Sequence, residues 1–260
     1  MLKILISNDD GINSSGIYEL TNSLSNIAKV TVVAPESERS ASGQSITMHK
    51  PLRSRAVDFF GKDIDAWCIN GTPSDCVKFA LESLLKEKPD MVISGINHGS
   101  NLGTDVLYSG TVSAAIEGAI NGIPSIALSL CCHDHCDFSP YSKLSSILCR
   151  QLYQYGIEKG IVININFPYL PVEKIKGIKV TRLGVRKYRN CFVERKDPRG
   201  KSYYWLAGEL EDADNNDDDT DVNSINNKYI SITPIKIDLT SYELIDKMSK
   251  WNLKLKDDQI

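Results

Sequence analysis

The sequence predicts an α/β fold in which helices cover both faces of a mostly parallel sheet. Over the first two-thirds of the chain, strand-like apolar runs alternate with helix-like segments, as in repeated βαβ units. The length of 260 residues, 42% of them hydrophobic and 24% charged, suits one large α/β domain with a smaller appendage. The alternation stops near residue 168. We therefore predict an α/β domain over residues 1–168 and a β-rich extension over residues 169–260.

Each predicted element of the first part follows from its hydrophobic period. Short β-branched or apolar runs indicate buried strands, and apolar residues three and four positions apart indicate helices. The predicted strands are Leu2–Ile6, Val30–Ala34, Trp67–Ile69, Met91–Ser94, Ser125–Leu130 and Ile161–Phe167. The predicted helices are Gly16–Ala28, Asp75–Leu85, Thr111–Ile120 and Tyr141–Tyr155.

The pattern of the predicted extension is different. Gly177–Leu183, Lys201–Leu206 and Tyr229–Pro234 are strand-like and have no helix between them, which predicts an antiparallel extension or hairpin. Glu209–Asp221 holds eight acidic residues, as is typical of a solvated loop. Tyr242–Leu253 has the period of a final amphipathic helix. Such appendages are usually buried, either against a second copy in a homodimer or homotetramer or as a hairpin folded back on its own domain.

Charge and composition exclude several classes of function. The formal net charge of −3 offers no basic surface for a nucleic-acid polymer. No apolar run approaches the roughly 20 residues that span a bilayer, and the N-terminus does not resemble a signal peptide. We expect a cytoplasmic protein with no membrane partner. In that compartment the seven cysteines are expected to be reduced thiols.

The most informative motif is Ser7-Asn8-Asp9-Asp10-Gly11, which directly follows the first predicted strand. It leaves Asp9 and Asp10 at the carboxyl end of that strand, the sheet edge where ligands bind in open α/β folds. Two adjacent carboxylates repel each other unless a cation or a proton lies between them. The motif therefore favours a hard divalent cation such as Mg²⁺ or Mn²⁺. The alternative is a turn in which one Asp caps the next helix.

Two further polar segments end at the same predicted edge. The loop 35–45 follows the second strand and contains Ser40, whose hydroxyl is a candidate oxygen ligand. The glycine-rich loop 94–103 follows the fourth strand and contains Asn97, which offers a carbonyl oxygen to a metal or an amide to a phosphate. His98 is a candidate proton donor, although a solvent-exposed or supporting role is the more common one.

A fourth segment suits an anion. Ser109, Gly110 and Thr111 open the third predicted helix, where free amides, the helix dipole and hydroxyl groups all favour a phosphate. A simple Ser cap is the alternative. Neither a Walker loop nor a Gly-x-Gly-x-x-Gly dinucleotide turn is present.

The run from Cys131 to Cys136 contains three cysteines and two histidines. Structural zinc sites normally combine two ligand pairs that are a dozen or more residues apart, whereas these candidates crowd one loop. We therefore predict no zinc site in this run.

Together these motifs closely resemble those of the SurE family, the survival-protein 5′/3′-nucleotidases. The resemblance extends over nearly the whole chain and in the same order. It rests on Ser7–Gly11, Arg39-Ser40, Gly71–Val77, Ser94–Asn97, Tyr108–Val112 and Ser231–Pro234.

The resemblance implies a Rossmann-like, doubly wound N-terminal domain and a C-terminal part that exchanges elements between subunits of a homodimer or homotetramer. It implies a divalent-metal-dependent phosphatase that acts on nucleoside monophosphates, with one Mg²⁺, Mn²⁺ or Co²⁺ per subunit. Carried over by residue, the metal ligands are Asp9, Asp10, Ser40 and Asn97. The phosphate would lie near Asn97, Ser109, Gly110 and Thr111.

The mechanistic hypothesis is hydrolysis by a metal-activated water, because no residue stands out as a covalent nucleophile. Asp9, Asp10 and Asn97 are the candidate catalytic residues. The base, the preference for 5′- or 3′-monophosphates and activity on polyphosphate are left open by these residues. One alternative is a receiver-like signalling domain, but the expected Asp and Lys at later strand ends are missing. The other is a nucleotide sensor without turnover.

Overall fold

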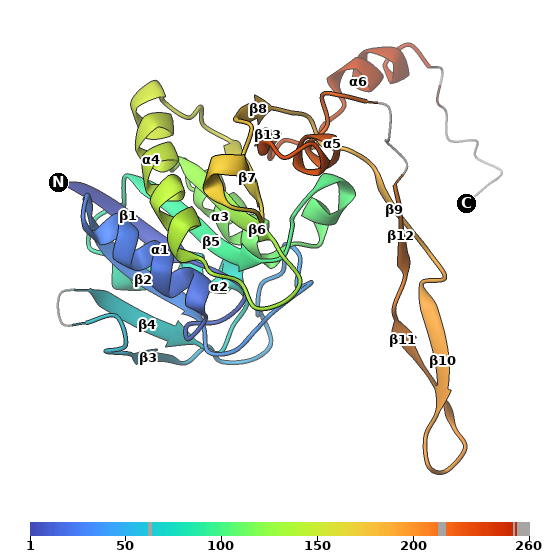
Figure 1. Ribbon diagram of the computed structural model, residues 1–260, viewed down its shortest axis with the longest axis horizontal. Helices are drawn as coiled ribbons and strands as arrows, with labels where there is room; N and C mark the ends of the chain where they lie inside the picture. Colours follow the sequence, from blue (N-terminus) through green and yellow to red (C-terminus); the bar gives the residue numbers. More distant parts are fainter. Residues whose placement is uncertain (62–63, 213–216, 252, 254–260) are drawn as a thin grey trace.

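The computed structural model describes residues 1–61, 64–212, 217–251 and 253. Its body is a nine-stranded sheet with the order β3-β4-β2-β1-β5-β6-β7-β13-β8 (Figure 1). From β4 to β7 the neighbouring strands are parallel. The strands of this sheet are β1 Leu2–Ser7, β2 Ala28–Pro35, β3 Ser54–Ala56, β4 Asp65–Ile69, β5 Met91–His98, β6 Ser125–Cys131, β7 Ile161–Pro168, β8 Ile178–Val180 and β13 Ile230–Lys236.

Helices pack on both faces of the sheet, which confirms the predicted doubly wound α/β architecture. Ile4 and Ile6 of β1 lie in the core beneath α1 and α4, whereas Leu5, between them, lies in the core beneath α2 and α3. This alternation follows from the period of two in a strand. The helices are α1 Ser15–Ser25, α2 Pro73–Phe79, α3 Gly110–Ile120 and α4 Ser139–Tyr155, with short turns at Ala80–Leu84, Gly103–Leu107 and Val172–Lys174.

The helix predicted over Asp75–Leu85 has a different start and end. It begins at Pro73, because Thr72 and Asp75 form a reciprocal capping box in which each side chain accepts the other's main-chain N–H. From Ala80 to Leu84 it continues as a π-helical turn. Sequence analysis also missed β3, a short, fully exposed edge strand with no apolar alternation.

Two of the three strand-like segments assigned to the extension join the main sheet instead. β13 pairs antiparallel with β7, and β8 pairs parallel with β13. Only Lys201–Leu206 lies outside that sheet, as β11 (Ser202–Leu206). The prediction was wrong here because apolar alternation reveals a strand but not its partner. The sheet thus gains an antiparallel strand from far along the chain.

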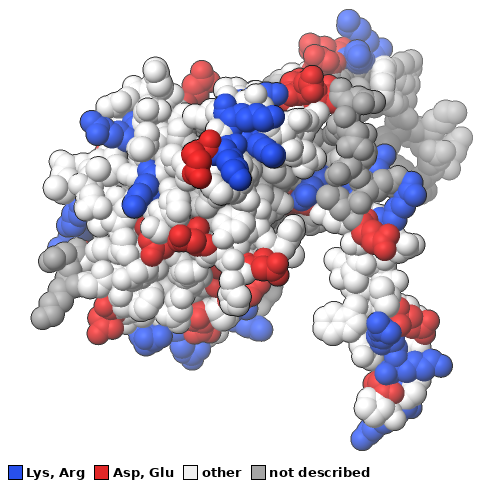
Figure 2. Space-filling model, viewed as in Figure 1, with Lys and Arg blue, Asp and Glu red and all other residues white. Residues whose placement is uncertain are grey.

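A long arm leaves the body between β8 and β13 (Figure 1). β10 (Phe192–Lys196) and β11 form an antiparallel hairpin, and β9 (Arg186–Arg189) pairs with β12 (Glu209–Asp212) nearer the body. Figure 2 shows the arm standing clear of the body and carrying both basic and acidic side chains. Its hairpin exposes Phe192, Tyr204 and Trp205. The predicted C-terminal helix ends earlier than expected, as α6 (Tyr242–Met248), and is exposed throughout.

The acidic run Glu209–Asp221 is only in part the solvated loop that its charge predicts, because residues 217–219 are exposed loop but both ends of the run are structured. It begins as β12, which pairs antiparallel with β9. Residues 213–216 lie outside the described residues. The run ends at Asp221, a fully buried residue at the start of α5 (Asp221–Asn226), whose carboxylate accepts N–H groups from Gly103, Gly184 and Val222, each at 2.8 Å.

The cysteines correct a second expectation. Cys132 and Cys136 form a disulfide, so the prediction of reduced thiols throughout was wrong for this pair. Cys68, Cys76, Cys131, Cys149 and Cys191 are free. The two cysteines are only four residues apart, and this spacing alone does not reveal that they are bonded to each other.

The free thiols should differ sharply in reactivity. Burial raises the pKa of Cys149 to about 12, so at pH 8 only about one in ten thousand of these thiols is the reactive thiolate. Iodoacetamide should therefore modify the half-buried Cys191 in the native protein and leave Cys149 untouched, as read by peptide mass spectrometry. In urea both should react. Equal labelling of the two in native protein would contradict this.

Candidate active site

The candidate site lies at the carboxyl edge of the sheet, where the strand order reverses. From β1 the chain proceeds outward through β2 to β4, then crosses to β5 on the other side of β1. Asp9 and Asp10 follow β1, and Asn97 lies near the end of the adjacent β5. A crevice at such a switch point is where open α/β sheets bind ligands. The fold therefore brings together residues predicted from distant segments.

The turn after β1 is held by Asn8 and Gly11. The Asn8 side-chain amide donates to the carbonyl of Gly11 at 2.9 Å and to Ser14 Oγ at 2.8 Å. Gly11 has φ +95°, and a Cβ there would lie 3.1 Å from the main-chain carbon of Ser37. The turn thus packs directly on the loop that follows β2.

Asp9 is buried, with 5% of its surface exposed, and is held from two sides. The Thr111 hydroxyl donates to its carboxylate, and the Arg39 N–H donates to its main-chain carbonyl at 2.7 Å. Burial raises the pKa of Asp9, and the hydrogen bonds from Thr111 oppose that rise. The start of α3 thereby fixes the orientation of this carboxylate.

Asp10 is less enclosed than Asp9, and its pKa is raised as well. Its Oδ2 accepts the main-chain N–H of His98 at 3.0 Å. Burial, followed by the charge of Asp9, raises the pKa of Asp10 to about 7. Glu38 adds a smaller repulsion at both aspartates. Such a cluster of acids is stabilised by a cation, which favours the charged form of each carboxylate.

A bulge in β5 places Asn97 at this edge. The pairing of β5 with β6 shifts register between Ser94 and Asn97. Asn97 is 9% exposed, and its side-chain N–H donates to the carbonyl of Gly99 at 2.9 Å. That bond uses the nitrogen as a donor and leaves the amide oxygen as the candidate metal ligand.

The loop after β2 covers the site from the other side. Ser40, the predicted hydroxyl ligand, is exposed, and its Oγ donates to Glu38 Oε1 at 2.5 Å. The Ser42 Oγ is buried and has no hydrogen-bond partner among the described residues. A buried hydroxyl without a partner is costly, and a bound cation or phosphate would satisfy it.

The N-terminus of α3 faces Asp9. Ser109 caps the helix by accepting the Val112 N–H at 3.1 Å. A Cβ at Gly110 would lie 2.7 Å from the Asp9 Cβ and 2.9 Å from the Ser42 Oγ. Only glycine allows this close approach. The Thr111 hydroxyl, which was predicted to hold phosphate, donates to Asp9 instead, so anion binding here would rely on main-chain N–H groups and the helix dipole.

The residues present fit a hard divalent cation. Asp9, Asp10, Asn97 and Ser40 offer only oxygen atoms, the ligand type that Mg²⁺ and Mn²⁺ prefer. The raised pKa of Asp10 and the unpaired Ser42 hydroxyl both indicate that the edge is incomplete without such a group. Sequence analysis missed Glu38, Ser42 and the His98 main-chain N–H, although the first two lie in the loop it had singled out.

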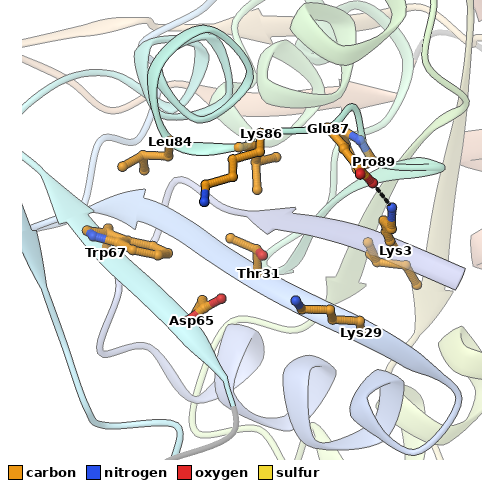
Figure 3. A pocket seen from close by; sticks show the side chains of 11 residues that line it. Lys3, Lys29, Thr31, Asp65, Trp67, Leu84, Lys86, Glu87 and Pro89 are labelled. Carbon is orange, nitrogen blue, oxygen red and sulfur yellow. Dashed lines mark hydrogen bonds and ion pairs between the residues drawn. The ribbon is translucent and has the colours of Figure 1, made fainter. Parts of the chain in front are cut away.

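A separate cavity of about 480 Å³ lies at the opposite, amino edge of the sheet (Figure 3). Lys29, Lys86, Trp67 and Asp65 line it, and Lys3 is paired there with Glu87. It holds no closely paired acids and is far from the loops that carry the predicted residues. We therefore place the candidate site at the carboxyl edge.

The raised pKa of Asp10, caused first by burial and then by the charge of Asp9, predicts a gain in stability when the carboxylate is removed. Asp10→Asn should stabilise the metal-free protein by about 1–3 kcal/mol at pH 8. The folded-state pKa of Asp10 is about 7, above the value near 4 in an unfolded chain, so ionising it costs stability increasingly as the pH rises from 4 to 7. Asn stays neutral throughout.

Urea unfolding in the presence of a chelator, at pH 4.5 and at pH 8, measures this effect. The stability gain of the variant over wild type should be clearly smaller at pH 4.5 than at pH 8. A variant that is less stable than wild type at pH 8 would contradict the cost assigned to ionising Asp10.

Comparisons with known proteins agree with this geometry. The family model described as Survival protein SurE matches residues 4–190. The 5′-nucleotidase SurE of Moorella thermoacetica is 52% identical over 248 residues, 95% of each chain. That of Heliobacterium modesticaldum is 50% identical over 250 residues, 96% of this chain and 92% of the relative.

A solved structure matches as well. The crystal structure of the SurE protein from Aquifex aeolicus has a TM-score of 0.83 and 41% sequence identity, and the match covers 95% of this chain and 98% of that one. Among the described residues, no helix is long and apolar enough to cross a membrane. The family model spans more than half of the chain and close relatives span nearly all of it, and the chain therefore belongs to the SurE family.

Proposed function

We propose that this chain is a divalent-metal-dependent 5′-nucleotidase that hydrolyses nucleoside monophosphates to nucleoside and phosphate. The observation that carries the proposal is the buried Asp9 against the N-terminus of α3, with the half-buried Asp10 beside it. Metal-binding carboxylates and an anion-binding helix end thus meet at one edge. The substrate class follows the name of the relatives, 5′-nucleotidase SurE.

Asp9, Asp10, Ser40 and Asn97 would hold one cation per subunit, with Mg²⁺, Mn²⁺ and Co²⁺ as candidates. When bound, the cation supplies Lewis acidity toward a phosphate oxygen and lowers the pKa of a water molecule.

The chain's own residues do the rest by positioning. The Thr111 hydroxyl orients the Asp9 carboxylate, and the His98 N–H orients that of Asp10. Main-chain N–H groups around Gly110 bind the phosphate oxygens as charge develops on them. Asp10 is placed to orient the attacking water or accept its proton. Water attacks the phosphorus directly, since phosphate-ester hydrolysis depends more on charge neutralisation and alignment than on covalent chemistry.

Phosphate release from AMP by metal-stripped protein tests the proposal, with and without added Mn²⁺ or Mg²⁺. Turnover that returns with metal in wild type but not in Asp9→Asn supports it. A folded protein that binds AMP and Mn²⁺ but releases no phosphate with any metal would overturn it and favour a sensor. Parallel assays with a 3′-monophosphate and with polyphosphate define the substrate range.

We further infer that the segment 169–260 joins copies of the chain into a homodimer or homotetramer in the cytoplasm. The arm and α6 expose Trp205, Phe192 and Ile245, which a partner copy would bury. Sedimentation equilibrium of the purified chain distinguishes these states from a monomer.

A further inference from the structure

A second group of potential metal ligands lies beside the candidate active site. Cys132 and Cys136 flank the loop after β6, and His98 ends the adjacent β5. Ligand atoms of the three side chains all lie within 4.8 Å of one another. β5 and β6 are neighbours and His98 pairs with Leu130, so the sheet itself brings the histidine to the base of the loop. His98 of β5 thus adds a third potential metal ligand to the two cysteines of the loop after β6.

One ring nitrogen of His98 is held by the loop that carries the two cysteines, which leaves the other as the candidate ligand. Its Nε2 lies 2.7 Å from the main-chain carbonyl of Asp134. A carbonyl only accepts hydrogen bonds, so Nε2 carries the hydrogen and Nδ1 keeps its lone pair. Metal-binding histidines characteristically donate their other ring N–H to a carbonyl or carboxylate, which fixes the tautomer and the ring.

We propose that the reduced protein binds a thiophilic divalent cation, Zn²⁺ or a chemically similar ion, through Cys132 Sγ, Cys136 Sγ and His98 Nδ1. Two sulfur atoms and one nitrogen, with a water in the fourth position, make a tetrahedral set suited to that class of metal. The donor set differs in kind from the oxygen ligands around Asp9 and Asp10. Hard cations such as Mg²⁺ therefore favour the oxygen ligands at Asp9 and Asp10. Softer cations such as Zn²⁺ favour the two cysteines and His98.

The site forms only after reduction of the disulfide by a thiol. Two reductant thiols become one disulfide, the Cys132–Cys136 bond breaks, and two electrons and two protons pass to the cysteine sulfurs. Metal binding then forms two metal–sulfur bonds and one metal–nitrogen bond, and releases both protons to solvent. The oxidised and metal-bound forms are thus mutually exclusive states of one loop.

Neighbouring residues provide the control. Cys131 directly precedes the pair, but it is not part of the three-residue grouping, and burial raises its pKa to about 12. His133 and His135 are exposed and likewise fall outside the grouping. The proposal therefore separates Cys132 and Cys136 from the adjacent thiol.

The test is a titration with Co²⁺ alone, monitored by thiolate-to-metal charge-transfer absorption in the near ultraviolet. Oxygen ligands do not produce this band, so Co²⁺ bound at Asp9 and Asp10 does not contribute to the signal. Wild-type protein reduced with dithiothreitol and desalted without oxygen should gain the band by two equivalents of Co²⁺, enough for both proposed sites, and lose it to Zn²⁺. Oxidised protein should show none. Cys132→Ser and Cys136→Ser should abolish the band, His98→Ala should weaken binding at least tenfold, and Cys131→Ser should keep it.

Three results would overturn the proposal: no band in reduced wild type, a full band in Cys132→Ser, or loss of the band in Cys131→Ser. No nucleotide is present, so the result is independent of turnover. A protein that shows the band but releases no phosphate would contradict only the nucleotidase proposal. A protein that releases phosphate but shows no band would contradict only the proposed cysteine and histidine metal site.

Discussion

Asp9→Asn and Asp10→Asn should each reduce metal-dependent phosphate release from AMP by at least about a hundredfold while leaving the protein folded. Each change replaces a charged oxygen ligand with a neutral amide, and charge neutralisation by a metal contributes several kcal/mol in such reactions. At position 9 the asparagine keeps an oxygen that can accept the Thr111 hydroxyl bond, so what the change removes is the charge. Steady-state rates with saturating Mn²⁺ measure the effect.

Asp65→Asn is the matched control, because Asp65 is an exposed acid at the opposite edge of the sheet. Its rate should equal that of wild type. Combined with the stability prediction, Asp10→Asn should be the less active and, without metal, the more stable protein at pH 8. Near-wild-type turnover in either aspartate variant would remove these carboxylates from the mechanism.

Gly110→Ala should lower the rate by about ten- to a hundredfold, although it adds only one methyl group. The new Cβ would lie 2.7 Å from the Asp9 Cβ and 2.9 Å from the Asp9 Oδ2, closer than such atoms can approach. The carboxylate or the first turn of α3 must move, and small misplacements of catalytic groups are costly. The rate at saturating metal and AMP reads this effect.

Gly122→Ala is the control for Gly110→Ala, because it should lower stability without lowering the rate. It lies at the other end of α3 with nothing within 4 Å of an added Cβ, but its φ of +73° strains alanine. It should therefore cost about 1 kcal/mol of stability and leave the rate unchanged. If Gly122→Ala loses as much activity as Gly110→Ala, the effect belongs to the helix as a whole rather than to contact with Asp9.

The sequence predicts the body of the fold well because its strands are short apolar runs separated by helices with a clear period. The site is predictable for the same reason, since each polar segment directly follows a predicted strand and parallel strands end at one edge. Asp9, Asp10 and Asn97 are placed this way.

What the sequence does not reveal is which partner each group takes. Thr111 has the residue type of a phosphate-binding hydroxyl, yet its hydrogen goes to Asp9. Tyr229–Pro234 is recognisable as a strand, but its pairing with β7 depends on contacts across more than sixty residues of chain. His98 approaches Cys132 and Cys136 only because β5 and β6 are adjacent.

The late arrival of β13 has a consequence for synthesis on the ribosome. β7 ends at Pro168 and β13 begins at Ile230, so at about 5–20 residues per second roughly 3–12 s of translation separate them. During that interval the N–H and C=O groups along the outer edge of β7 have no strand to pair with. During that time the unpaired edge of β7 can associate with strand edges of other nascent chains. The yield of folded protein will therefore depend more on how well this edge is shielded during synthesis than on the stability of the finished sheet.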